Sequence, residues 1–286
     1  MQRIFILGDE WVYLKIYVNP AESDRILLDS ICSLKDKLLN DGIIDKWFYL
    51  RYGDPEYHLR IRFHLVRTGH LGLLIGLFND AIKQDIVKKY IWKIQADTYN
   101  REMERYGGEL TIEFSESLFF HQSEMVLHQL NELRSNRVEE KRMWIPVIMM
   151  IDELLNIFEF SVFDKCNQFK KLTSQFLDEF NYNTKDKKYL SNKYREVKGD
   201  VYNIMNGNLF IKDCLYIKKT STTIQKLFTK YALQKSNIKH YNIVSYIHML
   251  INRYFDNCPR AHELVIYYIL WTYYKSIIAQ NAKAMS

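Results

Sequence analysis

Polar and apolar side chains alternate in the segment HLRIRFHL, residues 58–65. Because successive side chains of a strand point to opposite faces, this spacing predicts that His58, Arg60 and Arg62 share one face. Two neighbouring guanidinium groups suit a dicarboxylate such as a glutamyl group, since arginine binds carboxylates through paired hydrogen bonds. A solvated strand face is the plainer interpretation, and this segment taken alone favours it.

A second polar cluster ends at a pair of glycines. In YNREMERYGG, residues 99–108, Glu102 and Arg105 are three positions apart and would be neighbours on a helical turn. Gly107 and Gly108 then break the turn. An exposed ion pair is the ordinary interpretation. The alternative is a turn that presents both side chains at a cleft.

The third cluster lies near the C-terminus, in SYIHMLINRYF. Ser245, His248 and Asn252 fall on one face of a predicted helix. A histidine in such a helix is more often structural. If His248 faces an arginine cluster, however, nearby positive charge would keep the imidazole neutral and able to accept a proton. His248 is then a candidate general base.

Short strands and helices are expected to position the first two clusters. Trp11 to Val18, Lys46 to Tyr52 and His58 to Leu65 are aromatic and β-branched with a period of two, which is typical of strands. Helical spacing predicts helices over 20–39 and about 73–89, and a further strand is expected near 90–95. The sequence therefore predicts a small mixed β-sheet with helices on one face.

From about residue 116 the pattern is helical almost throughout. The expected helices lie near 117–134, 138–160, 164–181, 186–205, 219–234, 240–255 and 260–281. The predicted fold class is α+β, with the small mixed β-sheet and its helices in the N-terminal part and a mainly helical C-terminal part. We expect one domain over 1–286, made of an α+β part, 1–115, and a mainly helical part, 116–286.

The composition narrows the function classes. The net charge is only +6, and the lysine-rich stretch 185–198 also holds acidic and aromatic residues, so we expect a solvated helix face and no direct nucleic acid binding. Four scattered cysteines and a start without a secretion signal predict a reduced, cytoplasmic protein. The longest apolar run, 264–274, is too short for an integral membrane segment. The signatures of nucleotide-binding loops, zincins and serine hydrolases are missing from the sequence.

Taken in order along the chain, the three clusters and their flanking segments resemble the elimination domain of class I lantibiotic dehydratases, which also occurs as separate thiopeptide-type bacteriocin biosynthesis proteins. The resemblance rests on WVYLKIY, KWFYLRYGDPEYHLRIRF, DTYNREMERYGGE, ESLFFHQSE and HMLINRYF. Each segment is weak alone, but together they cover essentially the whole chain. The resemblance implies a lyase that expels glutamate from glutamylated Ser or Thr of a precursor peptide, leaving dehydroalanine or dehydrobutyrine.

The resemblance also implies roles for individual residues. The family's glutamate-binding and catalytic positions correspond here to Arg60, Arg62, Glu102, Arg105 and His248. We assign the last three to catalysis, and the two strand arginines, with His58 and Asn252 beside them, to substrate binding. His248 is expected to act either as the base or as the acid that assists departure of the leaving group. We expect no cofactor and no metal ion.

Two features depart from the family. The usual Asp-Ser pair in the segment after RYGG reads Gln122-Ser123 here, so no role of that aspartate carries over. The chain also starts just before the first predicted strand, whereas full-length relatives carry an N-terminal glutamylation module. We therefore expect a separate partner protein that uses glutamyl-tRNA to glutamylate the precursor peptide. The resemblance is compatible with a lanthionine cyclase as a further partner and with a homodimer.

Two other functions stay open. Relatives of this fold in thiopeptide pathways are pyridine synthases, which join two dehydroalanines in a formal cycloaddition. That reaction has no glutamyl carboxylates to bind, so the presence of HLRIR, ERYGG and HMLINR together favours elimination. A non-catalytic subunit that binds the precursor peptide would use the same polar clusters only structurally.

Overall fold

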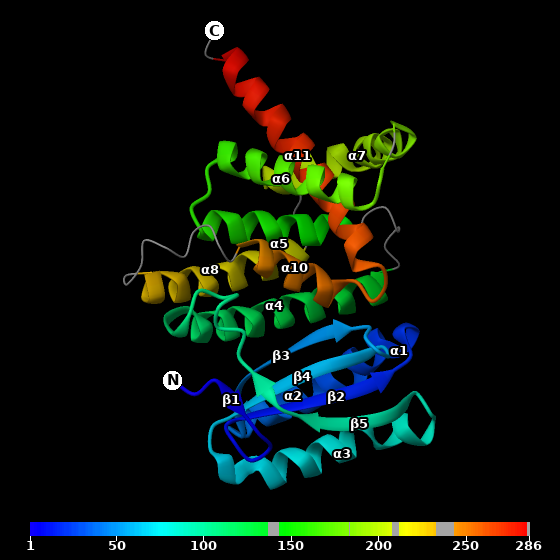
Figure 1. Cartoon of the computed structure of the whole chain (residues 1–286), viewed down its shortest axis with the longest axis vertical. Helices are drawn as coiled ribbons and strands as arrows, with labels where there is room; N and C mark the ends of the chain where they lie inside the picture. The colour runs from blue at the N-terminus through cyan, green and yellow to red at the C-terminus, as the bar shows by residue number, and fades with distance from the viewer. Residues whose placement is uncertain (137–142, 183, 208–211, 233–242, 285–286) are drawn as a thin grey trace. The chain divides into compact units, whose positions relative to one another are not determined.

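The computed structural model describes residues 1–136, 143–182, 184–207, 212–232 and 243–284 (Figure 1). Contacts between residues divide the chain into two compact units. The first comprises 1–131 and 234–257, and the second comprises 132–233 and 258–286. The chain therefore leaves the first unit after residue 131 and returns to it later with helix α10, Ile243–Tyr254.

The first unit contains the strands and the helices of the N-terminal part. Its strands are β1 (Ile4–Phe5), β2 (Trp11–Val18), β3 (Ile44–Tyr52), β4 (His58–Leu65), β5 (Ile91–Asp97) and β6 (Tyr99–Asn100). Its helical elements are α1 (Pro20–Arg25), η1 (Ile26–Ile31), α2 (Cys32–Asn40), η2 (Thr68–His70), α3 (Leu71–Val87), most of α4 (Glu109–Asn136) and α10. The strands and helices predicted for 11–95 are confirmed, with a π-helical middle in the first predicted helix.

Four strands form an antiparallel sheet in the order β3-β4-β2-β5, and β1 pairs with β6. Tyr13 of β2 lies opposite Arg62 on one side and opposite Asp97 on the other. β2 and β3 run in the same direction, as a β-α-β unit predicts, but β4 pairs with both and lies between them. The sheet is therefore antiparallel rather than mixed, while the predicted α+β class is confirmed.

The alternation predicted for β4 places its side chains on two faces of the sheet. Leu59, Ile61 and Phe63 are fully buried on one face. Helix α2 contacts β3, α3 contacts β5, and the two helices contact each other. Helix α3 lies on the side of the sheet away from α4 (Figure 1). Arg60 and Arg62 occupy the opposite face, which stays partly open.

Helices α4 and α10 pack along β3, the edge strand of the sheet (Figure 1). Asn252 of α10 accepts a hydrogen bond from the backbone N–H of Arg51 at 3.0 Å and donates one to its carbonyl at 2.9 Å. The Tyr49 hydroxyl donates to the Arg253 carbonyl at 3.0 Å. Because the outward backbone groups of an edge strand need partners, these bonds fix α10 to the sheet.

The second unit is helical in its described part. It contains the end of α4 and helices α5 (Trp144–Ile157), α6 (Val162–Glu179), α7 (Thr184–Met205), α8 (Lys212–Ala232) and α11 (Pro259–Ala284). The predicted helices are confirmed, except that 138–142, 233–234 and 240–242 lie outside the described residues. Helices α6 and α11 share a core in which the Phe169 ring stacks on that of Tyr274. No helix in the described ranges has the length and apolar composition that a membrane crossing requires.

Candidate active site

A cleft opens on the polar face of the sheet, within the first unit. It encloses about 710 Å³, open solvent at its mouth included. Its walls come from β3, β4, the segment 99–106, α4 and α10. The structure brings six of the predicted site residues into these walls: Arg60, Arg62, Glu102, Arg105, His248 and Asn252. The seventh, His58, does not line the cleft and is hydrogen-bonded to Arg60.

Arg60 is held from two sides. Its Nε donates to Nε2 of His58 at 3.1 Å, and its guanidinium carbon lies 3.3 Å from the centroid of the Tyr52 ring. His58 Nδ1 lies 2.8 Å from the Glu56 carbonyl, so Nδ1 carries the proton and Nε2 is the acceptor. Burial, and secondarily the charge of Arg60, lower the pKa of His58. His58 is therefore a neutral residue that positions Arg60.

Arg62 lies in an aromatic cage rather than in a hydrogen-bond network. Its guanidinium carbon is 4.2 Å from the Tyr13 ring centroid, 4.8 Å from that of Tyr99 and 5.2 Å from that of Phe48. The residue is only 8% exposed, yet Nε and Nη1 have no hydrogen-bond partner among the described residues. Buried donors of a cation are costly to leave unpaired. This guanidinium is therefore suited to an anionic ligand.

Arg105 and Glu102 form the ion pair predicted from their spacing. Nη1 of Arg105 lies 3.0 Å from the Glu102 carboxylate, and Nε donates to the Ser245 hydroxyl at 3.3 Å. The two charged side chains are 39% and 59% exposed, so solvent weakens their attraction. The bond to Ser245 joins the segment 99–106 to α10 and brings the second and third sequence clusters together.

His248 and Asn252 lie one turn apart on α10 and both line the cleft. The amide of Asn252 is engaged with the backbone of Arg51 on both of its polar atoms. Asn252 therefore fixes the helix that carries His248, and this geometry favours a positioning role over a direct bond to substrate.

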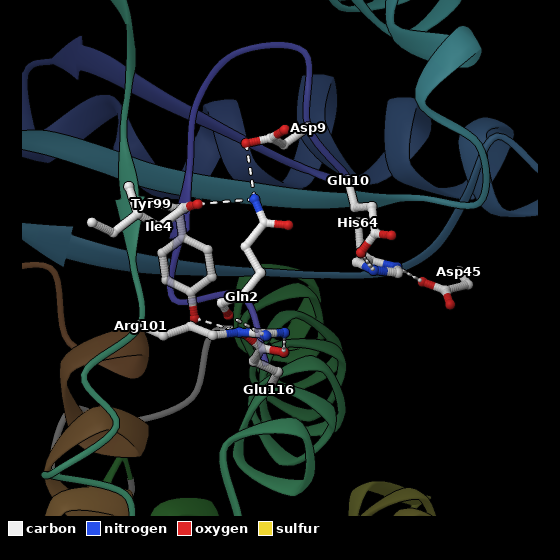
Figure 2. Close-up of polar contacts among 9 residues, drawn as sticks. All are labelled: Gln2, Ile4, Asp9, Glu10, Asp45, His64, Tyr99, Arg101 and Glu116. Carbon is white, nitrogen blue, oxygen red and sulfur yellow. Dashed lines mark hydrogen bonds and ion pairs between the residues drawn. The ribbon is translucent and has the colours of Figure 1, made fainter. Parts of the chain in front are cut away.

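Outside the cleft, Arg101 anchors the segment that leads to Glu102 (Figure 2). Its Nε and Nη2 each lie 2.7 Å from the buried Glu116 carboxylate, which also accepts from the Tyr99 hydroxyl at 3.0 Å. Arg101 Nη1 donates to the Gln2 carbonyl at 2.9 Å. These contacts fix β6 and Arg101 against α4, and Glu102 follows directly after this anchored segment.

Sequence reasoning missed several contributors to the cleft. The rings of Tyr13, Phe48 and Tyr99 cage Arg62, and Tyr52 supports Arg60. The strands were predicted, but the pairing that sets Tyr13 and Phe48 opposite Arg62 depends on strand order and register. Alternating aromatics in the neighbouring strands were the available signal.

The buried pair Arg253 and Gln122 behind the cleft was also missed. Nη1 of Arg253 donates to the Gln122 side chain at 3.1 Å, and its guanidinium carbon lies 4.8 Å from the ring of Phe119, a cleft residue. Gln122 is the first residue of the Gln122-Ser123 departure noted in the sequence. Its partner Arg253 carries no signal in the sequence, because an arginine next to a predicted helix core is usually exposed.

The charge of the cleft favours an anion. Arg51 is paired with Asp24, and Arg105 with Glu102. Neither Arg60 nor Arg62 has a carboxylate partner among the residues that the structure describes. Two cations on one strand face, with apolar rings around them, can hold the two charged ends of a dicarboxylate.

Comparisons with known proteins identify the family of the chain. A family model described as lantibiotic biosynthesis dehydratase C-term matches residues 11–274. The nisin biosynthesis protein NisB of Lactococcus lactis subsp. lactis is 27% identical over 263 residues, which are 92% of this chain and 25% of NisB. The chain thus spans about a quarter of the length of this curated relative.

Two solved structures share the fold. The tRNA-dependent lantibiotic dehydratase MibB from Microbispora sp. 107891 superposes with a TM-score of 0.72 at 17% identity, over 96% of this chain and 29% of MibB. The pyridine synthase TbtD from thiomuracin biosynthesis gives a TM-score of 0.59 at 11% identity, over 92% of this chain and 97% of TbtD. Because the family match runs from the first strand of the sheet to the last helix, the chain belongs to the lantibiotic biosynthesis dehydratase C-terminal family.

Proposed function

We propose that this domain is a lyase that eliminates glutamate from glutamylated Ser or Thr of a ribosomally made precursor peptide. The observation that carries the proposal is the pair Arg60 and Arg62, two cations without carboxylate partners in the described part of the chain, in one cleft with His248. Family membership supports a role in dehydration. A separate glutamylating protein that uses glutamyl-tRNA would supply the ester.

The proposed reaction is a β-elimination. A base removes the Cα proton of the esterified residue, the electron pair forms the Cα=Cβ double bond, and the Cβ–O bond breaks to release glutamate as a carboxylate. A carboxylate with an ordinary pKa of about 4 leaves without prior protonation. The cleft therefore needs a base more than an acid, and we assign His248 as that base, a role typically worth about 10² to 10⁴ in rate.

The arginines would act on the charges of the reaction. Arg60 and Arg62 would hold the glutamyl carboxylate and the ester oxygens, so that the Cα proton is presented to His248. Arg105 would stabilise negative charge on the leaving group or on the enolate-like peptide carbonyl. Glu102 bonds Arg105 at 3.0 Å and would orient it.

The test uses a synthetic peptide that carries a glutamyl ester on one Thr, incubated with the protein alone, without tRNA, ATP or metal. Mass spectrometry should show loss of glutamate and a dehydrobutyrine in its place. An ester that stays intact with folded protein would contradict the proposal.

Variants of the cleft separate binding from chemistry. Arg60→Ala should leave the ester intact because it is no longer positioned, whereas His248→Asn should slow elimination by about 10² or more and still bind L-glutamate. A control is Lys226→Ala, at an exposed position of α8 in the second unit, which should leave the rate unchanged. Full activity of both cleft variants would refute the residue assignments.

A pyridine synthase is the second candidate, because the likeness to TbtD covers 97% of that protein's length. At 11% identity this likeness concerns the fold. A peptide that already contains two dehydroalanines, incubated with the protein, distinguishes the two functions. Cyclisation of that peptide would favour the synthase, and its recovery unchanged beside active elimination would favour the lyase.

A further inference from the structure

Buried arginines of the first unit fall into two groups. Those more than nine-tenths buried are Arg51, Arg62, Arg101 and Arg253. Arg51 bonds the Asp24 carboxylate at 2.5 Å, and Arg101 bonds Glu116 through two nitrogens (Figure 2). Arg62 and Arg253 have no carboxylate partner in the described ranges. Arg62 faces the cleft, where an anionic ligand can pair with its guanidinium, but Arg253 does not line the cleft.

Arg253 has the surroundings of a neutral residue. It is fully buried, its guanidinium lies against the Phe119 ring, and its hydrogen bond goes to an amide, that of Gln122, at 3.1 Å. Nε and Nη2 of Arg253 and Nε2 of Gln122 have no partner among the described residues. Burial lowers the pKa of Arg253 to about 9, with a smaller contribution from the charge of Arg62, so the group remains cationic at neutral pH.

A purely structural role does not explain this charge. The bonds that tie position 253 to the sheet use its backbone carbonyl, which accepts from the Tyr49 hydroxyl at 3.0 Å and from Arg51 Nε at 2.8 Å. An apolar side chain would leave both bonds in place. A buried cation without a carboxylate costs stability, and replacing such a group by an apolar one of similar volume is often neutral or stabilising.

We infer that Gln122 keeps the charge of Arg253 uncompensated so that it acts through the Phe119 wall on the cleft and favours a ligand with a second carboxylate. Arg253 and Gln122 are thus positioning residues that set the preference for a glutamyl group over its uncharged amide analogue. This inference rests on the proposed function. Phe119 is both the wall of the cleft and the ring on which Arg253 lies, so little screening water separates the two.

Two variants remove the net charge by opposite means. Gln122→Glu adds a carboxylate beside Arg253, and Arg253→Met removes the guanidinium. The probes are L-glutamate and L-glutamine, which have the same shape and differ by one carboxylate. Both variants should lower the ratio of the two affinities roughly tenfold, the order expected for one unit charge about 10 Å away at an effective dielectric constant of about 20. A loosened cleft would weaken both ligands alike and leave the ratio unchanged.

Gln84→Glu, at an exposed position of α3, is the matched charge control and should leave the ratio unchanged. Thermal unfolding checks the fold, and Gln122→Glu should unfold at or above the wild-type temperature because it pairs a buried cation. An unchanged ratio in both folded variants, or no preference for L-glutamate in the wild type, would overturn the inference. Because these are binding measurements, a lowered ratio without elimination of the ester would refute the proposed function alone.

Discussion

The two arginines of β4 are two positions apart and are held by different means. Arg60 depends on one hydrogen bond, from its Nε to the neutral His58, and on stacking over Tyr52. Arg62 depends on ring faces, and its Nε and Nη1 have no hydrogen-bond partner within the described ranges. A proton on His58 would remove the acceptor and place a second cation beside Arg60. The rings of Tyr13, Phe48 and Tyr99 around Arg62 do not titrate in mild acid, so a fall in pH affects Arg60 before Arg62.

Glutamate binding should therefore weaken in mild acid through His58. The pKa of His58 is lowered in the folded state, so the unfolded chain takes up the proton at a higher pH than the folded one. The free energy of unfolding therefore also falls as the pH drops below about 6.5. His58→Gln retains an acceptor that does not titrate and should flatten the pH dependence of L-glutamate affinity, measured by calorimetry between pH 7.5 and pH 5.

His121 provides the control for this prediction. Burial lowers its pKa as well, so it contributes to the loss of stability in acid, but it does not line the cleft. His121→Gln should change the pH dependence of unfolding and leave that of binding as in the wild type. A wild-type pH dependence of binding in His58→Gln would show that another group is responsible.

At the scale of elements, α10 carries His248 to the sheet, to which it is bonded through the side-chain amide of Asn252 and the backbone carbonyl of Arg253. On its side away from β4, the edge strand β3 has no neighbouring strand at Arg51 in the described part of the chain. The Asn252 amide bonds the backbone N–H and carbonyl of Arg51 in its place, at 3.0 and 2.9 Å. The position of His248, one turn earlier, follows from this attachment. Among the described contacts, α10 touches the sheet at β3, so a shift of this bond would shift His248 relative to Arg60.

Asn252→Ala should cost about 1–3 kcal/mol of unfolding free energy, because two buried backbone groups of Arg51 lose their partner. The elimination rate of the folded variant should fall while L-glutamate affinity changes less, since the arginines stay on β4. Chemical denaturation and single-turnover kinetics measure the two effects. Asn257→Ala, at an exposed position just beyond α10, is the control. Equal losses in both variants would argue against the attachment.

Much of this element level could be predicted from the sequence. The period of two in 11–18 and 58–65 predicted both strands, although their burial does not alternate, since all of β2 except Lys15 is buried and in β4 only Arg60 and His64 are partly exposed. The sheet order could not be predicted, since it depends on pairing between strands that lie far apart in the sequence. The clusters around Arg60, Arg105 and His248 were identified by residue type and resemblance. Arg253 was not, because no local pattern shows that a charged side chain is buried without a counterion.

For the whole molecule, the lining of the cleft belongs to the first unit alone. The second unit has its own core, in which Phe169 of α6 is fully buried and its ring contacts Tyr267 and Tyr274 of α11. We therefore expect the stability of that core and the ligand affinity of the cleft to vary independently.

Phe169→Ala should lower the unfolding midpoint, with a cost of about 3–5 kcal/mol for the cavity. At 10 °C, below the transition, its affinity for L-glutamate should equal that of the wild type. Phe119→Leu, in the wall of the cleft, is the comparison and should weaken binding. A matching loss of affinity in Phe169→Ala would show that the two units are coupled.

The bond between Arg105 and Ser245 spans 140 positions of the chain. At a translation speed of about 5–20 residues per second, roughly 7–30 s separate the synthesis of these two residues. The arginines of β4 are therefore made well before α10, whose Ile247 and Leu250 are fully buried, so the first unit can complete its core only after most of the second unit has been translated.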